Sequence, residues 1–364
     1  MTTDQSTTTE RTGPKPNGEV RVKVDNLRKL FPISRGLFRA PTDFVHAVDG
    51  VNFQIRAGES LGLVGESGCG KTTTGRMLVK LEDATDGSIL IRDSESDELV
   101  NVTHINSKAD QKVFRRNVQM IFQDPYESMN PRRTIFDIVA EPLTVQNLGT
   151  TSEREERVVD LLRLVGLTPP EPFLFRYPHE LSGGQRQRVA IARALVMDPT
   201  FVVADEPTSM LDVSIRISIM RLMLELAEKL GVTYLYITHD LAVARYMCDR
   251  IAVMYLGKIV EMGPTEDLLS NPMHPYTRAL LSAVPVPDPS YRRPPVEIEG
   301  GVARAINPSA ECRFIARCPF ATDICATEHP PLDDRGDEHY VACYLVDAQG
   351  NWTGPKRAEL DLRS

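Results

Sequence analysis

The sequence lacks any long apolar run. No stretch of the 364 residues approaches the roughly 18 consecutive apolar residues that a membrane-spanning helix needs. The first 18 residues are polar and rich in threonine, without the apolar centre of a secretory signal. We therefore expect a chain that stays in the cytoplasm and meets a membrane only through a partner.

Positive charge is also in short supply. The chain has 42 lysines and arginines against 50 aspartates and glutamates, which gives a formal net charge of −8. A general nucleic-acid binder needs the opposite balance, so we expect no nucleic-acid partner. The length and the ordinary hydrophobic share of 41% allow one large domain or two smaller ones with a real core.

Cysteine is rare and unevenly placed. Four of the six cysteines crowd into one stretch with the spacing Cys-x₅-Cys-x₆-Cys-x₁₇-Cys, at Cys312, Cys318, Cys325 and Cys343. A reducing cytoplasm disfavours disulfides, and the chain has no Cys-x₂-Cys pair, which is the usual zinc-knuckle spacing. Four nearby thiolates suit either a zinc ion or an iron–sulfur cluster. The residues alone leave these two alternatives, and a set without metal, open.

What the sequence does contain is a phosphate-binding loop. Residues 65–72 match the pattern G-x-x-x-x-G-K-[ST], in which glycines let successive backbone N–H groups converge on nucleotide phosphates. An apolar strand over 61–64 leads into the loop, and a helix begins after it with its N-terminus facing the anion. We predict that Lys71 reaches the β- and γ-phosphates and that Thr72 binds Mg²⁺. The predicted nucleotide-binding residues of this region are Gly65, Glu66, Ser67, Gly68, Cys69, Gly70, Lys71, Thr72 and Thr73.

Further motifs follow at fixed separations. The sequence Leu-Ser-Gly-Gly-Gln occupies 181–185, so that Ser182 follows Lys71 by 111 positions. About twenty residues later, an apolar strand over 201–204 ends in Asp205-Glu206, and a strand over 232–237 ends just before His239. Each motif alone is weak, because acidic pairs and histidines often follow strands by chance.

In this order and at this separation, the motifs resemble those of ATP-binding-cassette (ABC) ATPases. The resemblance implies that Asp205 orders the Mg²⁺ shell, that Glu206 polarises the attacking water and that His239 touches the γ-phosphate. It also implies that Gln123, in Ile-Phe-Gln-Asp-Pro, contacts the Mg²⁺ or its water shell. Glu206, His239 and Gln123 are therefore the predicted catalytic residues, and Thr72, Gln123 and Asp205 the predicted Mg²⁺ site.

The same resemblance implies a composite site in a dimer. The signature residues Ser182, Gly183, Gly184 and Gln185 of one subunit would bind the ATP held by the other. Phe31 aligns with the aromatic residue that stacks on adenine, although core packing alone would also explain a phenylalanine there.

Other residues resemble one branch of the family, the importer subunits for di- and oligopeptides. These are the extended loop at 123–132, His-Pro-Tyr-Thr at 274–277 and the four clustered cysteines, and the resemblance covers about 19–344. It favours a [4Fe–4S] cluster on Cys312, Cys318, Cys325 and Cys343, with zinc as the alternative. It also implies a sibling ATPase in a heterodimer, two membrane permeases, an extracytoplasmic substrate-binding protein and a place at the cytoplasmic face of the bacterial inner membrane.

The alternation of strands and helices predicts an α/β fold. We expect an ABC-type P-loop NTPase core over 19–270 with a helical subdomain at about 124–195, after a disordered tail over 1–18. A proline-dense linker then leads into a small cysteine-rich C-terminal extension within 271–364. Within the helical part, Ser152 and Glu155 predict a capping box and Ser182 a helix start. Farther along the chain, Gly231 predicts the end of a helix over 215–230.

Rival functions within the family fit less well. ABC ATPases of DNA repair insert a long coiled coil between the phosphate loop and the signature, and 111 residues leave no room for one. Translation factors of the family carry two cassettes, whereas this chain has no internal repeat. The cargo stays open, because nickel, opines and some oligosaccharides use the same importer branch.

Overall fold

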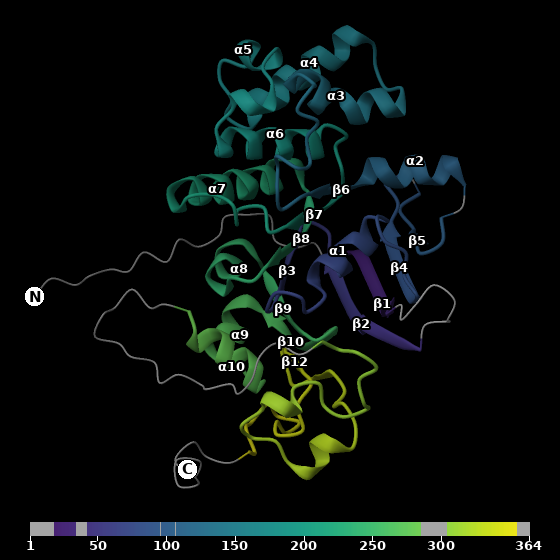
Figure 1. Cartoon of the computed structure of the whole chain (residues 1–364), viewed down its shortest axis with the longest axis vertical. Coiled ribbons are helices and arrows are strands. Elements are labelled where there is room, and N and C mark those ends of the chain that lie inside the picture. Colours follow the sequence, from purple (N-terminus) through teal and green to yellow (C-terminus); the bar gives the residue numbers. More distant parts are fainter. Residues whose placement is uncertain (1–17, 34–41, 95, 106, 285–303, 355–364) are drawn as a thin grey trace, which may run out of the picture.

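The computed structural model describes residues 18–33, 42–94, 96–105, 107–284 and 304–354. The expected disordered tail, apart from residue 18, and the proline-dense linker lie outside these residues. The molecule is elongated, with a group of helices at one end, two sheets in the middle and the C-terminal segment at the other end (Figure 1).

The larger sheet positions the predicted catalytic residues. Its strand order is β11-β12-β10-β9-β3-β8-β7-β6. The strands are β3 (Ser60–Val64), β6 (Val118–Ile121), β7 (Phe201–Asp205), β8 (Thr233–Thr238), β9 (Arg250–Tyr255), β10 (Lys258–Pro264), β11 (Asp333–Asp334) and β12 (Tyr340–Val341). Strands β6, β7, β8, β3 and β9 run parallel. Every residue of β3, β7 and β8 is buried, as expected for parallel strands covered on both faces.

A smaller antiparallel sheet packs beside it. Its order is β2-β1-β4-β5, with β1 (Val20–Ile33), β2 (Asp43–Arg56), β4 (Asp86–Arg92) and β5 (Leu99–Asn101). Helix α1 (Lys71–Leu78) contributes Met77 and Leu78 to an apolar core shared with β1, β2 and β3. Helix α2 (Lys108–Asn117) leads into β6. The C-terminal turn of α1 is thereby packed into the core that the two sheets share.

The helical end is formed by α3 (Ile135–Gln146), α4 (Thr151–Leu164), α5 (Glu171–Leu174) and α6 (Gly183–Leu195) (Figure 1). The expected cap of α4 was wrong, because Thr150 and Glu153 form the capping box instead of Ser152 and Glu155. Gly149, at φ +68°, turns the chain just before Thr150, so the helix begins two residues earlier. The expected cap of α6 is confirmed, since the Ser182 hydroxyl accepts from the Gln185 N–H.

Helix α7 (Val213–Leu230) ends at Gly231, whose φ of +64° confirms the expected stop. It is followed along the chain by α8 (Leu241–Met247), α9 (Thr265–Ser270) and α10 (Pro275–Ser282). None of the helices in the described ranges combines the length and apolar composition that crossing a bilayer needs.

Residues 304–354, here called the C-terminal segment, contain little regular structure. They hold two 3₁₀ turns (Ile315–Arg317 and Asp323–Ala326) and the short strands β11 and β12. Strand β12 pairs with β10 and so extends the larger sheet. Behind this pairing, the fully buried Glu261 carboxylate accepts from the backbone N–H groups of Met273 and His274 and contacts His339 Nε2 at 2.8 Å. The segment is therefore joined to the sheet through both backbone and buried side chains.

Candidate active site

The phosphate loop connects β3 to α1, and its geometry requires glycine at one point. Gly70 has a φ of +112°, and a Cβ there would lie 2.1 Å from the carbonyl oxygen of Ala47. Residue 70, which directly precedes α1, must therefore be glycine unless β2 moves to make room for a side chain. Lys71 is buried, and its Nζ donates to the carbonyl oxygens of Gly65 and Glu66 at 2.7 and 2.9 Å.

A cavity of about 480 Å³ opens over this loop. That volume lies within the usual range for small-ligand pockets. Its wall is lined by Val45, His46, Ala47, Ser67, Gly68, Gly70, Lys71, Thr72, Thr73, Gln123, Glu206, His239, Leu256, Gly257, Arg304 and Ala305. The structure thus brings loop residues and the three predicted catalytic residues to one cavity, although they come from distant parts of the chain.

Thr72 and Asp205 meet at the base of the loop. The Thr72 hydroxyl donates to Asp205 Oδ1 at 3.2 Å. Burial raises the pKa of the Asp205 carboxyl, and the neighbouring charge of Glu206 adds to this effect. One hydroxyl and one carboxylate on the same side of the loop fit Mg²⁺, which uses few protein ligands and completes its shell with phosphate and water.

Glu206 lies between Gln123 and His239. Gln123 Nε2 donates to Glu206 Oε2 at 3.3 Å, and His239 Nδ1 lies 3.0 Å from Glu206 Oε1. Glu206 also has a φ of +43°, in the left-handed region that non-glycine residues rarely adopt. Such backbone strain is concentrated at functional sites. The carboxylate is held by two neighbours at the cavity edge, where a water molecule could approach it.

The signature residues lie elsewhere on the same chain. Ser182 caps α6, and a Cβ on Gly184 would lie 2.7 Å from Ile215 Cγ2, so this glycine lets α6 approach α7 closely. None of Ser182, Gly183, Gly184 and Gln185 is among the described residues lining the cavity. Their predicted role at a second subunit's nucleotide stays a prediction.

Phe31 does not line the cavity among the described residues. It lies on β1 opposite Val45 of β2, and Val45 does line it. Lys29 Nζ lies 5.0 Å from the centre of the Phe31 ring. Stacking of Phe31 on adenine therefore also stays a prediction.

Several cavity residues were missed by the motif search. His46 and Ala47 come from β2, Gly257 from the turn after β9, and Arg304 from the C-terminal segment. The His46 N–H donates to the carbonyl oxygen of Ala305 at 2.8 Å, which brings Arg304 to the cavity wall. No local pattern marks these residues, because only the fold brings them together.

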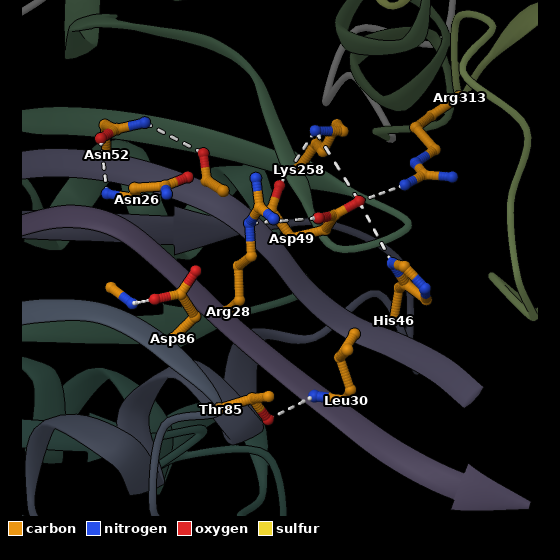
Figure 2. Close-up of polar contacts among 12 residues, drawn as sticks. Asn26, Arg28, Leu30, His46, Asp49, Asn52, Thr85, Asp86, Lys258 and Arg313 are labelled. Carbon is orange, nitrogen blue, oxygen red and sulfur yellow. Dashed lines mark hydrogen bonds and ion pairs between the residues drawn. The ribbon is translucent and has the colours of Figure 1, made fainter. Parts of the chain in front are cut away.

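Asp49, beside this wall, contacts two arginines, a lysine and a histidine (Figure 2). Arg313 forms an ion pair with it, and His46 Nδ1, Arg28 Nε and Lys258 Nζ lie 3.4, 3.8 and 3.9 Å from its carboxylate. Burial alone would raise the pKa of Asp49, but Lys258, Arg313 and His46 outweigh burial and hold that pKa below its ordinary value. Asp49 thus joins the smaller sheet and β10 to the C-terminal segment.

The four clustered cysteines line a separate small cavity together with His274 and Phe314. Burial raises the pKa of Cys318 to about 11 and that of Cys343 to about 12, and neighbouring cysteines contribute. All six cysteines of the chain are described, and none forms a disulfide. Within the described residues, no group of three or more His, Cys, Asp or Glu side chains is arranged to hold a metal ion. The structure thus does not show the expected [4Fe–4S] cluster or its zinc alternative.

Known proteins resemble this chain both in the region of the phosphate loop and in a later region that leads into the clustered cysteines. Residues 48–209 match the family model for ABC transporters, and residues 260–325 match the model for the C-terminal region of oligopeptide/dipeptide transporters. The oligopeptide transport ATP-binding protein AppF of Bacillus subtilis (strain 168) is 45% identical over 331 residues, 90% of this chain and 98% of that protein. The dipeptide transport ATP-binding protein DppF of Haemophilus influenzae is 44% identical over 321 residues, 88% and 95% of the two chains.

Solved structures agree on the fold of the core. The dimeric ATP-binding cassette MJ0796, in a post-hydrolysis state bound to ADP and Pi, gives a TM-score of 0.58 at 30% identity, covering 67% of this chain and 98% of that one. The cbiO1 protein of Clostridium perfringens, part of the ABC transporter complex cbiONQ, gives 0.57 at 27% identity, with coverage of 69% and 91%. The predicted α/β cassette fold is thereby confirmed.

Proposed function

The chain belongs to the ABC transporter family, among the ATP-binding subunits of oligopeptide- and dipeptide-type transporters, and from this premise we propose a role for each part of its site. It is an ATPase whose hydrolysis is coupled to transport, and such a subunit works with membrane permeases and dimerises. We propose that its cargo is di- and oligopeptides.

ATP would lie in the 480 Å³ cavity with its phosphates on the loop. Lys71 would turn from the Gly65 and Glu66 carbonyl oxygens toward the β- and γ-phosphates. Thr72 and Asp205 would hold Mg²⁺, which when bound offsets the negative charge of the phosphates. Glu206 would orient the attacking water and accept its proton, leaving ADP and phosphate. His239 and Gln123 hold Glu206 by its two oxygens, and His239 would also face the γ-phosphate.

One observation carries this assignment, the meeting of Gln123, Glu206 and His239 at the edge of the phosphate-loop cavity. Uptake of labelled dipeptide and tripeptide by cells deleted for this chain tests the cargo. Uptake should return with the wild-type chain and not with Lys71→Ala. Unchanged peptide uptake in the deleted cells, together with lost uptake of nickel, an opine or an oligosaccharide, would instead assign that cargo.

The proposed dimer is a heterodimer with a sibling ATPase, facing two permeases and an extracytoplasmic substrate-binding protein. Large apolar side chains near the signature support a protein partner, since Met210, Val213 and Ile217 are exposed. Co-purification followed by mass measurement of the assembly should give one copy of each ATPase. Two copies of this chain would contradict the heterodimer.

The permeases are proposed to meet the segment 123–133, at the cytoplasmic face of the inner membrane. A groove of about 810 Å³ beside this segment is lined by Phe122, Glu127, Ser128, Gln146 and Arg193, among others. A crosslinker on exposed Tyr126→Cys should capture a permease in the assembled complex. Capture by the ATPase partner alone would contradict this arrangement.

We also propose a ligand for the four C-terminal cysteines. Cys312, Cys318, Cys325 and Cys343 would hold a [4Fe–4S] cluster, because four thiols line one cavity in a cysteine-rich extension with little core of its own. A cluster there would crosslink four chain positions. Iron, sulfide and zinc are measured in anaerobically purified protein. About four iron and four sulfide per chain are expected for this cluster, whereas stoichiometric zinc would favour the zinc site and neither metal would refute both.

A further inference from the structure

The 3₁₀ turn Ile315–Arg317 lies between Cys312 and Cys318 and reaches the phosphate loop through its arginine. Arg317 Nη1 and Nη2 donate to Glu66 Oε2 and Oε1 at 2.7 and 3.1 Å. The side chains of Arg317 and Glu66 are 9% and 24% exposed, so this pair is largely shielded from water. A planar guanidinium that meets both oxygens of a carboxylate fixes orientation as well as distance.

A second contact holds the main chain of the same loop residue. The Glu66 N–H donates to the hydroxyl of Tyr276, which is fully buried on α10, at 2.9 Å. Phe314 packs against Tyr276 and Tyr255 with ring centres 5.5 and 5.2 Å apart. Glu66 is therefore held by side chain and by backbone from residues that lie more than 200 positions later in the sequence.

Glu66 occupies a sensitive position. Its carbonyl oxygen accepts from Lys71 Nζ, and the next two residues, Ser67 and Gly68, line the ATP cavity. Its own side chain points to Arg317 and is not among the described cavity-lining groups. An uncompensated carboxylate at this point would repel the phosphates of ATP, because unlike charges attract and like charges repel over these distances.

We propose that Arg317 is a positioning residue of the ATP site, which fixes the phosphate loop through Glu66 and neutralises its charge. This inference rests on the proposed binding of ATP at the loop. Arg317 touches neither the cavity nor Glu206 among its described contacts, so its loss should weaken ATP binding and leave the hydrolytic step intact. We expect a roughly tenfold weaker ATP affinity in Arg317→Met.

The test measures ATP affinity and steady-state hydrolysis of the full-length chain in its assembled transporter. Arg317→Met should raise KM for ATP about tenfold, with kcat at saturating ATP within about twofold of wild type. Arg317→Lys should fall between them, since lysine keeps the charge but loses the two-pronged geometry. Adding Glu66→Gln to Arg317→Met should restore part of the affinity, because the uncompensated carboxylate is then gone.

Arg245→Met is the matched control. Arg245 donates to both oxygens of Glu266 at 2.9 and 2.8 Å, on the exposed α8–α9 surface outside the cavity lining, so the KM for ATP should not change. If Arg317→Met fails to fold, Arg317→Lys decides in its place. Wild-type KM in Arg317→Met, or in Arg317→Lys where it replaces that variant, overturns the inference. Wild-type protein that binds no ATP, or binds it equally after Lys71→Ala, would instead refute the proposed function.

Discussion

Asp49→Asn is expected to loosen the C-terminal segment from the smaller sheet. Asp49 is the only anion among the five residues of its cluster, and it faces Arg313, His46, Lys258 and Arg28. Asparagine keeps the shape of the side chain and one acceptor oxygen but removes the negative charge that these four partners share. The substitution thus isolates the electrostatic contribution of one carboxylate.

The size of the effect follows from burial. Removing one partner of a fully buried ion pair costs about 3–5 kcal/mol, whereas an exposed pair contributes about 0–1 kcal/mol. The side chains of Asp49 and Arg313 are 14% and 7% exposed, so this pair is nearer the buried case. His46, Arg28 and Lys258 lie 3.4 to 3.9 Å from the Asp49 carboxylate and add less. We expect a loss of about 2–3 kcal/mol in the free energy of unfolding.

The single tryptophan provides the assay. Trp352 lies in the C-terminal segment, packed on Phe320 with ring centres 5.0 Å apart, so its fluorescence reports unfolding of that segment in urea. The urea concentration at the midpoint of unfolding should be lower in Asp49→Asn than in wild type. It should not change in Asp160→Asn, whose pair with Arg163 leaves both side chains more than half exposed. Equal midpoints for the two variants would refute the reasoning.

The stability that Asp49 contributes should also depend on pH in a direction that its pKa fixes. The pKa of Asp49 is lower in the folded chain than its ordinary value of 3.8. The folded state therefore binds this proton less readily, and the stabilisation is complete above that ordinary value and disappears as the pH falls through the lower folded pKa. The free energies of unfolding of wild type and Asp49→Asn should differ most at neutral pH. That difference should shrink as the pH falls below the ordinary pKa of 3.8. A difference that grows in acid would contradict the assignment.

Two further substitutions test local geometry. Gly70→Ala should reduce ATP affinity at least about tenfold, because a Cβ would lie 2.1 Å from the Ala47 carbonyl oxygen at a φ of +112°. Gly68→Ala, whose Cβ would meet nothing within 4 Å, should reduce ATP affinity less when ATP is titrated into both variants. Equal losses of affinity would refute the steric argument. Thr150→Ala should lower the free energy of unfolding by about 1 kcal/mol through loss of the α4 cap, when helix content is followed by circular dichroism in urea. Ser152→Ala should change that free energy by only about a few tenths of a kcal/mol, and the reverse order would favour the cap expected from the sequence.

The sequence predicted those parts of the site that are formed by short stretches of consecutive residues. The phosphate loop, the signature and the Asp205-Glu206 pair each occupy a short stretch, so residue type and spacing are enough to identify them. The cap of α4 shows where such patterns are ambiguous. Both Thr150-x-x-Glu153 and Ser152-x-x-Glu155 match a capping box, and the turn at Gly149 decides between them.

The rest depends on contacts between distant residues. Arg317 lies 251 positions from Glu66, and Arg313 lies 264 positions from Asp49. No periodicity or spacing connects such pairs, and only the pairing of β2 with the C-terminal segment brings Arg304 to the cavity. The cysteine spacing likewise predicted that four thiols would gather but could not specify what they bind.

The most direct test of the account separates ATP binding from ATP hydrolysis at Glu206. Glu206→Gln is measured beside wild type and Lys71→Ala, with ATP binding and single-turnover hydrolysis followed in the assembled transporter. The described side-chain contacts of Glu206 are with Gln123 and His239, and none of them is with the phosphate loop. Glu206→Gln should therefore bind ATP like wild type and hydrolyse it at least about 100-fold more slowly. Hydrolysis at the wild-type rate in Glu206→Gln would contradict the account.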